Sequence, residues 1–330
     1  MNDNVLYSTV SWIQGFGQRY LASRAQEQVL RQATDMVVEV ADPRIRRIGR
    51  YRKSLRAPMK GAMGYCTRLV DSIPGPVRLS RQQYHTDPLV KAIFVSADEL
   101  EEVLRLAPEN SDLSDQEKKN DSIALLTMTR KERTIFKHEQ QGDVILRDVK
   151  KRTVNFIDHR LVASSATLDM TKERLKDRGL EVLATIAMER ISSLRGDLAE
   201  LRERKEYLKA MRRMLNGRSR TQELFSQPDH ETVEKLRKLE KLIEEVAGDV
   251  ELIRKKIEMP EDSLALLGGV MGQPGDTLVA TEQTLRLDWM NVLLSDKDGS
   301  KGNDISLTEL SIKDELQRYA VLVVYSPPGE

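Results

Sequence analysis

The sequence has few cysteines, histidines and aromatic residues, and these shortages exclude several kinds of site. Its 330 residues include one cysteine, four histidines and 5% aromatic residues. A single cysteine, Cys66, excludes an internal disulfide and any zinc site built on several thiolates. The histidines show no paired spacing that would favour a metal site or an acid–base pair. We therefore expect no metal and no cofactor, and we do not expect an enzyme.

Long hydrophobic runs and targeting signals are also missing. No stretch approaches the roughly 18 uncharged apolar residues that a transmembrane helix needs. The first residues lack the positive start and apolar run of a secretory signal. These observations favour a cytoplasmic protein without a transmembrane segment.

Sequence motifs for catalysis and for nucleotide or calcium binding are absent. There is no Walker loop, no dinucleotide fingerprint and no Gly-x-Ser-x-Gly. The Asp- and Gly-rich loop at 296–306 fails the twelve-residue spacing of a calcium loop. Asp158 and His159 are neighbours in a predicted strand, where adjacent side chains point to opposite faces and cannot form a relay. An enzyme that uses His159 is kept only as a third hypothesis.

The strongest feature of the sequence is a heptad pattern that occurs in two successive segments. Apolar residues recur every seven positions in two segments, and a loop with glycine and proline separates them. The outgoing positions are Leu180, Ala187, Leu194, Leu201, Leu208 and Leu215, and the returning positions are Leu236, Ile243, Val250 and Ile257. The pattern predicts an antiparallel coiled-coil hairpin over residues 171–258, with its tip at 216–231.

The tip of this hairpin is a candidate binding surface. It combines two apolar side chains, Leu224 and Phe225, with two cations, Arg218 and Arg220. These four residues are predicted to contact a protein partner. The alternatives are that the hairpin only stiffens the fold, or that it pairs with a second copy in a homo-oligomer.

Net charge is +1, but the basic residues are concentrated near the N-terminus. Seven cations without an intervening acid fall on an amphipathic helical pattern: Arg44, Arg46, Arg47, Arg50, Arg52, Lys53 and Arg56. Such a segment suits the phosphates of nucleic acid or anionic lipids. The alternative is that acidic side chains of the same chain neutralise it, and the acidic stretch 98–121 is the expected source.

The first third of the chain contains residues that are typical of helix starts. Asp42 followed by Pro43 predicts a helix start, and Pro58 predicts another. Ser96 and Glu99 have the spacing of a capping box, which predicts a helix that runs to Leu106.

Strand signals lie on both sides of the heptad region. Before it, three short runs separated by turns at 141–143 and 150–152 predict a β-meander. After it, strands are predicted at 284–294, 305–312 and 319–325. Because small groups of strands are unstable alone, both groups should join one sheet, with the hairpin inserted between strands. The fold class is therefore α+β with a mixed β-sheet head.

These signals predict four parts and two functions. The parts are a basic helical region at 1–106, an acidic linker at 107–131, a β-rich head at 132–170 and 259–330, and the hairpin at 171–258. The first function is a non-enzymatic adaptor or scaffold that binds a macromolecular partner through the hairpin. The alternative is a nucleic-acid-associated protein that uses the basic segment 44–60. No motif assigns the chain to a family.

Overall fold

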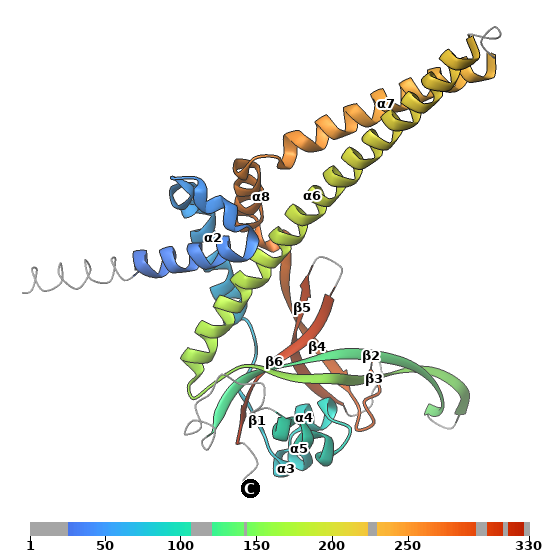
Figure 1. Cartoon of the computed structure of the whole chain (residues 1–330). Coiled ribbons are helices and arrows are strands. Elements are labelled where there is room, and N and C mark those ends of the chain that lie inside the picture. The colour runs from blue at the N-terminus through green and yellow to red at the C-terminus, as the bar shows by residue number, and fades with distance from the viewer. Residues whose placement is uncertain are drawn as a thin grey trace, which may run out of the picture. The chain divides into compact units, whose positions relative to one another are not determined.

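The computed structural model describes residues 26–106, 121–141, 144–223, 230–294, 302–312 and 316–326, with the side chains of 137–148 and 222–223 excepted. The fold is α+β, and a pair of helices is inserted between two strands of one sheet, as predicted (Figure 1). The described residues form two compact units. The first extends to Gly61 and resumes over Glu181–Gly272, and the second comprises Ala62–Leu180 and Gln273 onward.

The first described element of the first unit is a helix at residues 26–41, followed by the short 3-10 helix η1 (Pro43–Arg47) and the start of α2 (Tyr51–Asp71). Asp42 caps η1, as the sequence predicted, because its carboxylate accepts from the backbone N–H of Arg44 at 3.2 Å. The predicted helix start at Pro58 is wrong, since Pro58 lies inside α2. Buried side chains continue on both sides of it, so packing offsets the hydrogen bond that proline cannot donate.

Two further helices run antiparallel in the first unit (Figure 1): α6 (Leu168–Glu223), from Glu181 onward, and α7 (His230–Ile257). We call this pair the arm. One hydrophobic cluster joins both helices through the predicted heptad positions, including Ile191, Leu198, Leu208, Leu239, Val246 and Val250. The predicted tip loop at 216–231 is too long, because α6 continues to Glu223. A single glycine costs a helix only about 1 kcal/mol, so Gly217 does not end it.

The residues after the arm also differ from the prediction. α8 (Pro260–Gly272) is a helix of the first unit, although its sequence contains Gly268 and Gly269 and was assigned to the β-rich head. Buried Leu267, Val270 and Met271 show why the helix forms. Their packing outweighs the low helix propensity of glycine.

The second unit is built on a six-stranded mixed sheet in the order β3-β2-β6-β5-β4. Its long strands are β2 (Ser122–Gln141), β3 (Val144–Ser165), β4 (Leu278–Leu287), β5 (Asn303–Ile312) and β6 (Leu316–Tyr325). The short β1 (Val77–Leu79) pairs with β6 in parallel, and every other pairing is antiparallel. The acidic linker predicted at 107–131 is therefore wrong from Ser122, where β2 begins.

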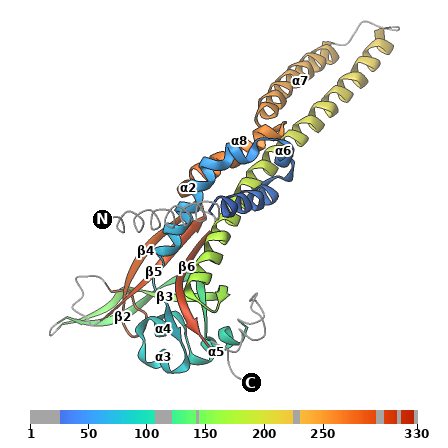
Figure 2. The ribbon, with the colours of Figure 1, turned by 90° about the vertical axis from the view of Figure 1, so that its left-hand side faces the viewer.

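The predicted β-meander is also wrong, because β2 and β3 form one long hairpin. The expected turn at 150–152 lies within β3, opposite residues 134–136 of β2. Ladder hydrogen bonds to this partner compensate for the low strand propensity of Lys and Arg. Pairing between β2 and β6 ends at Met128, and the hairpin continues beyond that point (Figure 2). There the outer edge of β3 bonds to residues 291–293: the N–H of Val154 donates to the carbonyl of Asn291 at 2.9 Å, and the N–H of Leu293 donates to the carbonyl of Arg152 at 2.8 Å.

Helices cover both faces of the sheet within this unit. α3 (Arg81–Thr86), α4 (Pro88–Ile93) and α5 (Ala97–Leu106) lie over one face and close the main core (Figures 1 and 2). Ser96 caps α5 as predicted, since its hydroxyl accepts from the N–H of Glu99 at 3.1 Å. On the other face, Val70, Ile73 and Leu175 pack on the sheet. The short 3-10 helix η4 (Pro274–Asp276) leads into β4.

Candidate interaction surfaces

The predicted basic segment is largely neutralised by acids of the preceding helix and its cap. Four of its seven cations form ion pairs with N–O distances of 3.3, 2.9, 2.7 and 2.7 Å: Arg44 with Asp42, Arg46 with Glu39, Arg52 with Asp35, and Arg56 with Glu27. The prediction that the stretch 98–121 supplies the partners is wrong for these four cations. The acids are 2 to 29 residues away in sequence, and helix packing brings them close.

The contacts of Asp35 show that part of this segment serves the fold. Arg52 donates two parallel hydrogen bonds to the Asp35 carboxylate, at 2.9 and 2.7 Å, and the hydroxyl of buried Tyr51 donates a third at 2.7 Å. The hydrogen bond from Arg52 is the largest effect that lowers the pKa of Asp35. Bidentate geometry of this kind fixes the orientation of both groups.

Three cations of the segment stay available to a ligand. Arg47, Arg50 and Lys53 are exposed, and none of them forms an ion pair within the described part of the chain. They offer far less charge to a polyanion than seven cations would.

The predicted residues of the arm tip are only partly described. Arg218 and Arg220 are exposed on the last turns of α6, and neither forms an ion pair with a described residue. Leu224 and Phe225 lie outside the described residues, so their role stays a prediction.

An exposed apolar stripe lies on α6 and was missed by the sequence interpretation. Tyr207 is 62% exposed and Met214 is 65% exposed, with partly buried Met211 between them. Their i, i+4 and i+7 spacing places all three on one helix face. Met211 also packs against the hydrophobic cluster of the arm, as Leu215 does, so Tyr207 and Met214 are the exposed members of the stripe. The same spacing could have revealed the stripe, but the stronger heptad pattern beside it determined the assignment.

The same part of α6 is strongly basic. Between Arg202 and Arg220 there are eight Lys/Arg and two Asp/Glu, so eight minus two gives a net charge of +6. The two acids are Glu203 and Glu206, and Glu206 pairs with Lys209 at 2.7 Å. The stripe therefore lies in a positive environment.

His159 is packed as a core residue. Its side chain is 3% exposed and stacks on Phe94, with a ring centroid distance of 4.7 Å. One ring nitrogen lies 3.4 Å from Glu99 and the other 3.2 Å from the carbonyl of Ile93. Burial is the main cause that lowers the pKa of His159. The adjacent Asp158 is exposed and pairs with Arg318 instead, at 2.7 Å, so the two residues form no relay.

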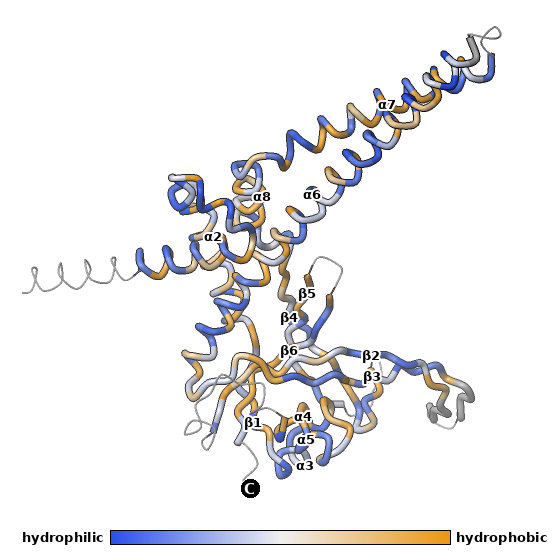
Figure 3. The backbone as a smooth tube through the Cα atoms, viewed as in Figure 1, coloured by the Kyte–Doolittle hydropathy of each residue, from blue (hydrophilic) through white to orange (hydrophobic). Residues whose placement is uncertain are grey.

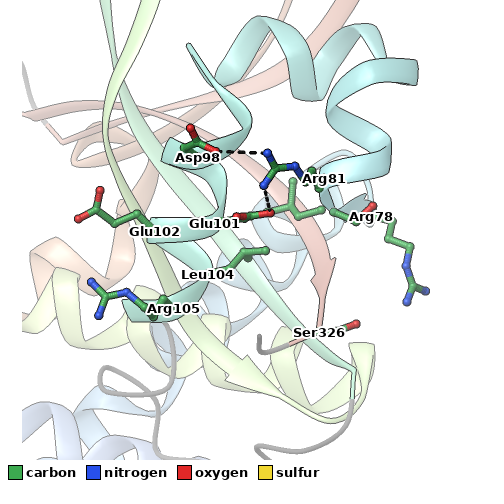
Figure 4. A pocket seen from close by; sticks show the side chains of 10 residues that line it. Arg78, Arg81, Asp98, Glu101, Glu102, Leu104, Arg105 and Ser326 are labelled. Atoms are coloured by element: carbon green, nitrogen blue, oxygen red, sulfur yellow. Dashed lines mark hydrogen bonds and ion pairs between the residues drawn. The ribbon is translucent and has the colours of Figure 1, made fainter. Parts of the chain in front are cut away.

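A hollow of about 620 Å³ lies in the second unit between α5 and the end of β6. Figure 4 shows Arg81 linked to Asp98 and Glu101, at 3.6 and 2.9 Å. Arginines and carboxylates line it in equal number, three of each. Their charges offset one another, so we assign no ligand to this hollow.

Neither a search of the described residues nor comparison with known proteins assigns any chemistry to the chain. Among the described residues, no group of three or more His, Cys, Asp or Glu side chains could hold a metal ion. None of the described helices is long and apolar enough to cross a membrane. The chain matches no protein-family model, no curated protein and no solved structure.

Proposed function

We propose that this protein is a cytoplasmic, non-enzymatic adaptor that binds a helical segment of a partner protein through α6 of the arm. The exposed stripe of Tyr207, Met211 and Met214 carries this proposal. Solvent exposure of two large apolar side chains on one helix face costs free energy that a partner would recover. A partner helix would turn the two-helix arm into a three-helix arrangement.

The charge of the arm favours an acidic partner over a second copy. A net charge of +6 between Arg202 and Arg220 would repel an identical helix and attract an amphipathic helix with carboxylates beside its apolar face. The tip residues predicted from sequence, Arg218 and Arg220, belong to the same basic stretch. We therefore place Leu224 and Phe225 in the proposed contact as well.

Affinity purification from the native cells tests this function. We compare the wild-type chain with the variant Tyr207→Ser/Met214→Ser, which removes exposed groups only and should fold normally. The matched control is Val233→Ser/Leu252→Ser, which removes two exposed apolar side chains of α7. A discrete partner should be captured by the wild type and the control and lost by the stripe variant.

Direct titration with the purified partner completes the test. The stripe variant should bind at least about tenfold more weakly, as expected when central apolar anchors are removed. If the stripe variant and the control bind the partner with equal affinity, the proposal is refuted. Sedimentation equilibrium would reveal a second copy as the occupant if the wild type dimerises and the stripe variant does not.

The nucleic-acid alternative now depends on Arg47, Arg50 and Lys53. Their exposure and lack of ion pairs within the described residues are the observations that favour it. Phosphate contacts by three cations would give log K a slope against log salt of about −2.7. A variant with glutamine at all three positions should abolish that slope, and an unchanged slope would reject this segment as the binding surface.

A further inference from the structure

A groove of about 370 Å³ lies between the helix at residues 26–41 and the start of α2, within the first unit. In Figure 3 hydrophilic and hydrophobic residues alternate along both helices, which is typical of helices that bury one face only. The hydrophilic residues that line the groove are Glu27, Arg31 and Thr34 of the first helix and Arg52, Lys53 and Arg56 of α2. We call this site the basic groove.

The lining of the basic groove contains more positive than negative charge. It has four cations and one carboxylate, whereas the hollow beside α5 has equal numbers of both. Arg31 and Lys53 are exposed and form no ion pair with any described residue. An anion that enters the groove therefore meets two cations whose charge no described carboxylate offsets.

The other two cations of the groove are held in place by ion pairs between the two helices. Arg52 donates to Asp35 through Nε and Nη2, and Arg56 donates to Glu27 through Nη2. Nη1 of each guanidinium forms no hydrogen bond with a described residue, so each arginine keeps donors for a ligand. Because the carboxylates already orient these side chains, a ligand would lose less entropy in ordering them.

We propose that the basic groove binds the oligophosphate group of a small molecule, either a nucleoside triphosphate or inorganic tripolyphosphate. Guanidinium groups bind phosphate oxygens in a bidentate geometry. The volume of the groove falls within the range of about 300–1,000 Å³ that is typical of small-molecule sites.

The lining favours phosphates over a nucleobase and over nucleic acid. No aromatic side chain is among the described residues that line the groove, so a base would gain no stacking there. A terminal phosphate carries a charge of about −1.5 to −2 at pH 7, whereas each phosphate of a nucleic acid carries a single charge along an extended chain. Cations gathered around one hollow suit the concentrated charge. No residue of the arm lines the groove, so the inference stands whether or not the proposed adaptor function holds.

The two unpaired cations set the size of the expected effect. Hydrogen bonds to charged groups contribute more than neutral ones, but Arg31 and Lys53 are exposed, which weakens the interaction. We therefore expect about tenfold weaker oligophosphate binding when both lose their charge. The affinity of the wild type should also fall as salt rises, because the Debye length is about 10 Å at 0.1 M.

Isothermal titration calorimetry of the full-length protein with inorganic tripolyphosphate, ATP and adenosine tests this site, in a buffer without divalent cations. The test variant is Arg31→Gln/Lys53→Gln. The control, Arg47→Gln/Arg50→Gln, removes the same charge from two exposed cations that do not line the groove. Circular dichroism verifies that both variants fold.

The proposal expects both oligophosphates to bind and adenosine not to bind. The test variant should bind them about tenfold more weakly, with the control close to wild type. Equal affinities for ATP and tripolyphosphate would identify the phosphate chain as the whole recognised group, and tighter binding of ATP would identify a nucleotide as its source.

Three results would overturn the proposal: no binding of either oligophosphate by the wild type, equal losses in the test variant and the control, or adenosine binding as tight as that of ATP. The variant Tyr207→Ser/Met214→Ser should bind ATP like the wild type. Failure of the adaptor function is thereby distinguished from failure of the basic groove.

Discussion

Replacing Arg195 with methionine should destabilise the first unit through the carboxylate that it leaves behind. Asp42 is 3% exposed and pairs with Arg195, which is 31% exposed. The same guanidinium also donates to the hydroxyl of buried Ser263 at 2.9 Å. Methionine keeps the apolar stem of the side chain, so the substitution removes mainly the charge and the hydrogen bonds.

The magnitude follows from what Asp42 retains. Breaking a buried ion pair costs about 3–5 kcal/mol when the remaining charge is uncompensated. Here the Arg44 side chain stays 3.3 Å from Asp42 and its backbone N–H still donates to the carboxylate. Because of this compensation and the partial exposure of Arg195, we expect a loss of about 2–3 kcal/mol. The variant Asp42→Asn/Arg195→Met removes the buried charge but keeps a capping side chain, so it should recover about 1 kcal/mol.

Urea unfolding followed by circular dichroism at 222 nm measures these free energies. Because the chain has two units, tryptophan fluorescence provides a second probe that tests for separate transitions. Arg204→Met is the matched control, since Arg204 is an exposed cation of the same helix without an ion pair to a described residue, and its replacement should change stability by less than about 0.5 kcal/mol. The reasoning fails if Arg195→Met is as mild as this control, or if the double variant is less stable than the single one.

Two further predictions concern Gly179 and His159 of the second unit, and Gly196 of the first unit serves as the comparison for Gly179. Gly179→Ala would place a Cβ atom 3.0 Å from the sulfur of Cys66 and should lower the free energy of unfolding by about 1–3 kcal/mol. Gly196→Ala, whose Cβ would meet nothing within 4 Å, should stabilise α6 by up to about 1 kcal/mol. Thermal unfolding distinguishes the two variants, and equal shifts of Tm would contradict the packing argument. His159 has a lowered pKa because it is buried, so its contribution to stability is complete above its ordinary pKa of 6.5 and is lost as pH falls below it. In His159→Gln the free energy of unfolding should fall less between pH 7 and pH 5, and an unchanged pH profile would show that His159 does not titrate as inferred.

Local sequence patterns by themselves determined the two helices of the arm and several helix ends. The heptad positions repeat within single segments, and a side chain at such a position needs only the helical period to join a seam, so the helix pair and its insertion between strands were predictable. Ser96 and Asp42 cap helices through contacts two or three residues away, and these were predictable too. The α+β class followed from the same patterns.

Only the tertiary structure decided which groups meet and which stay exposed. Pro58 and Gly268 lie inside helices because packing outweighs their local preferences, and a sequence pattern does not report packing energy. The basic segment was visible in the sequence, but Asp35 neutralises Arg52 only because two helices pack together.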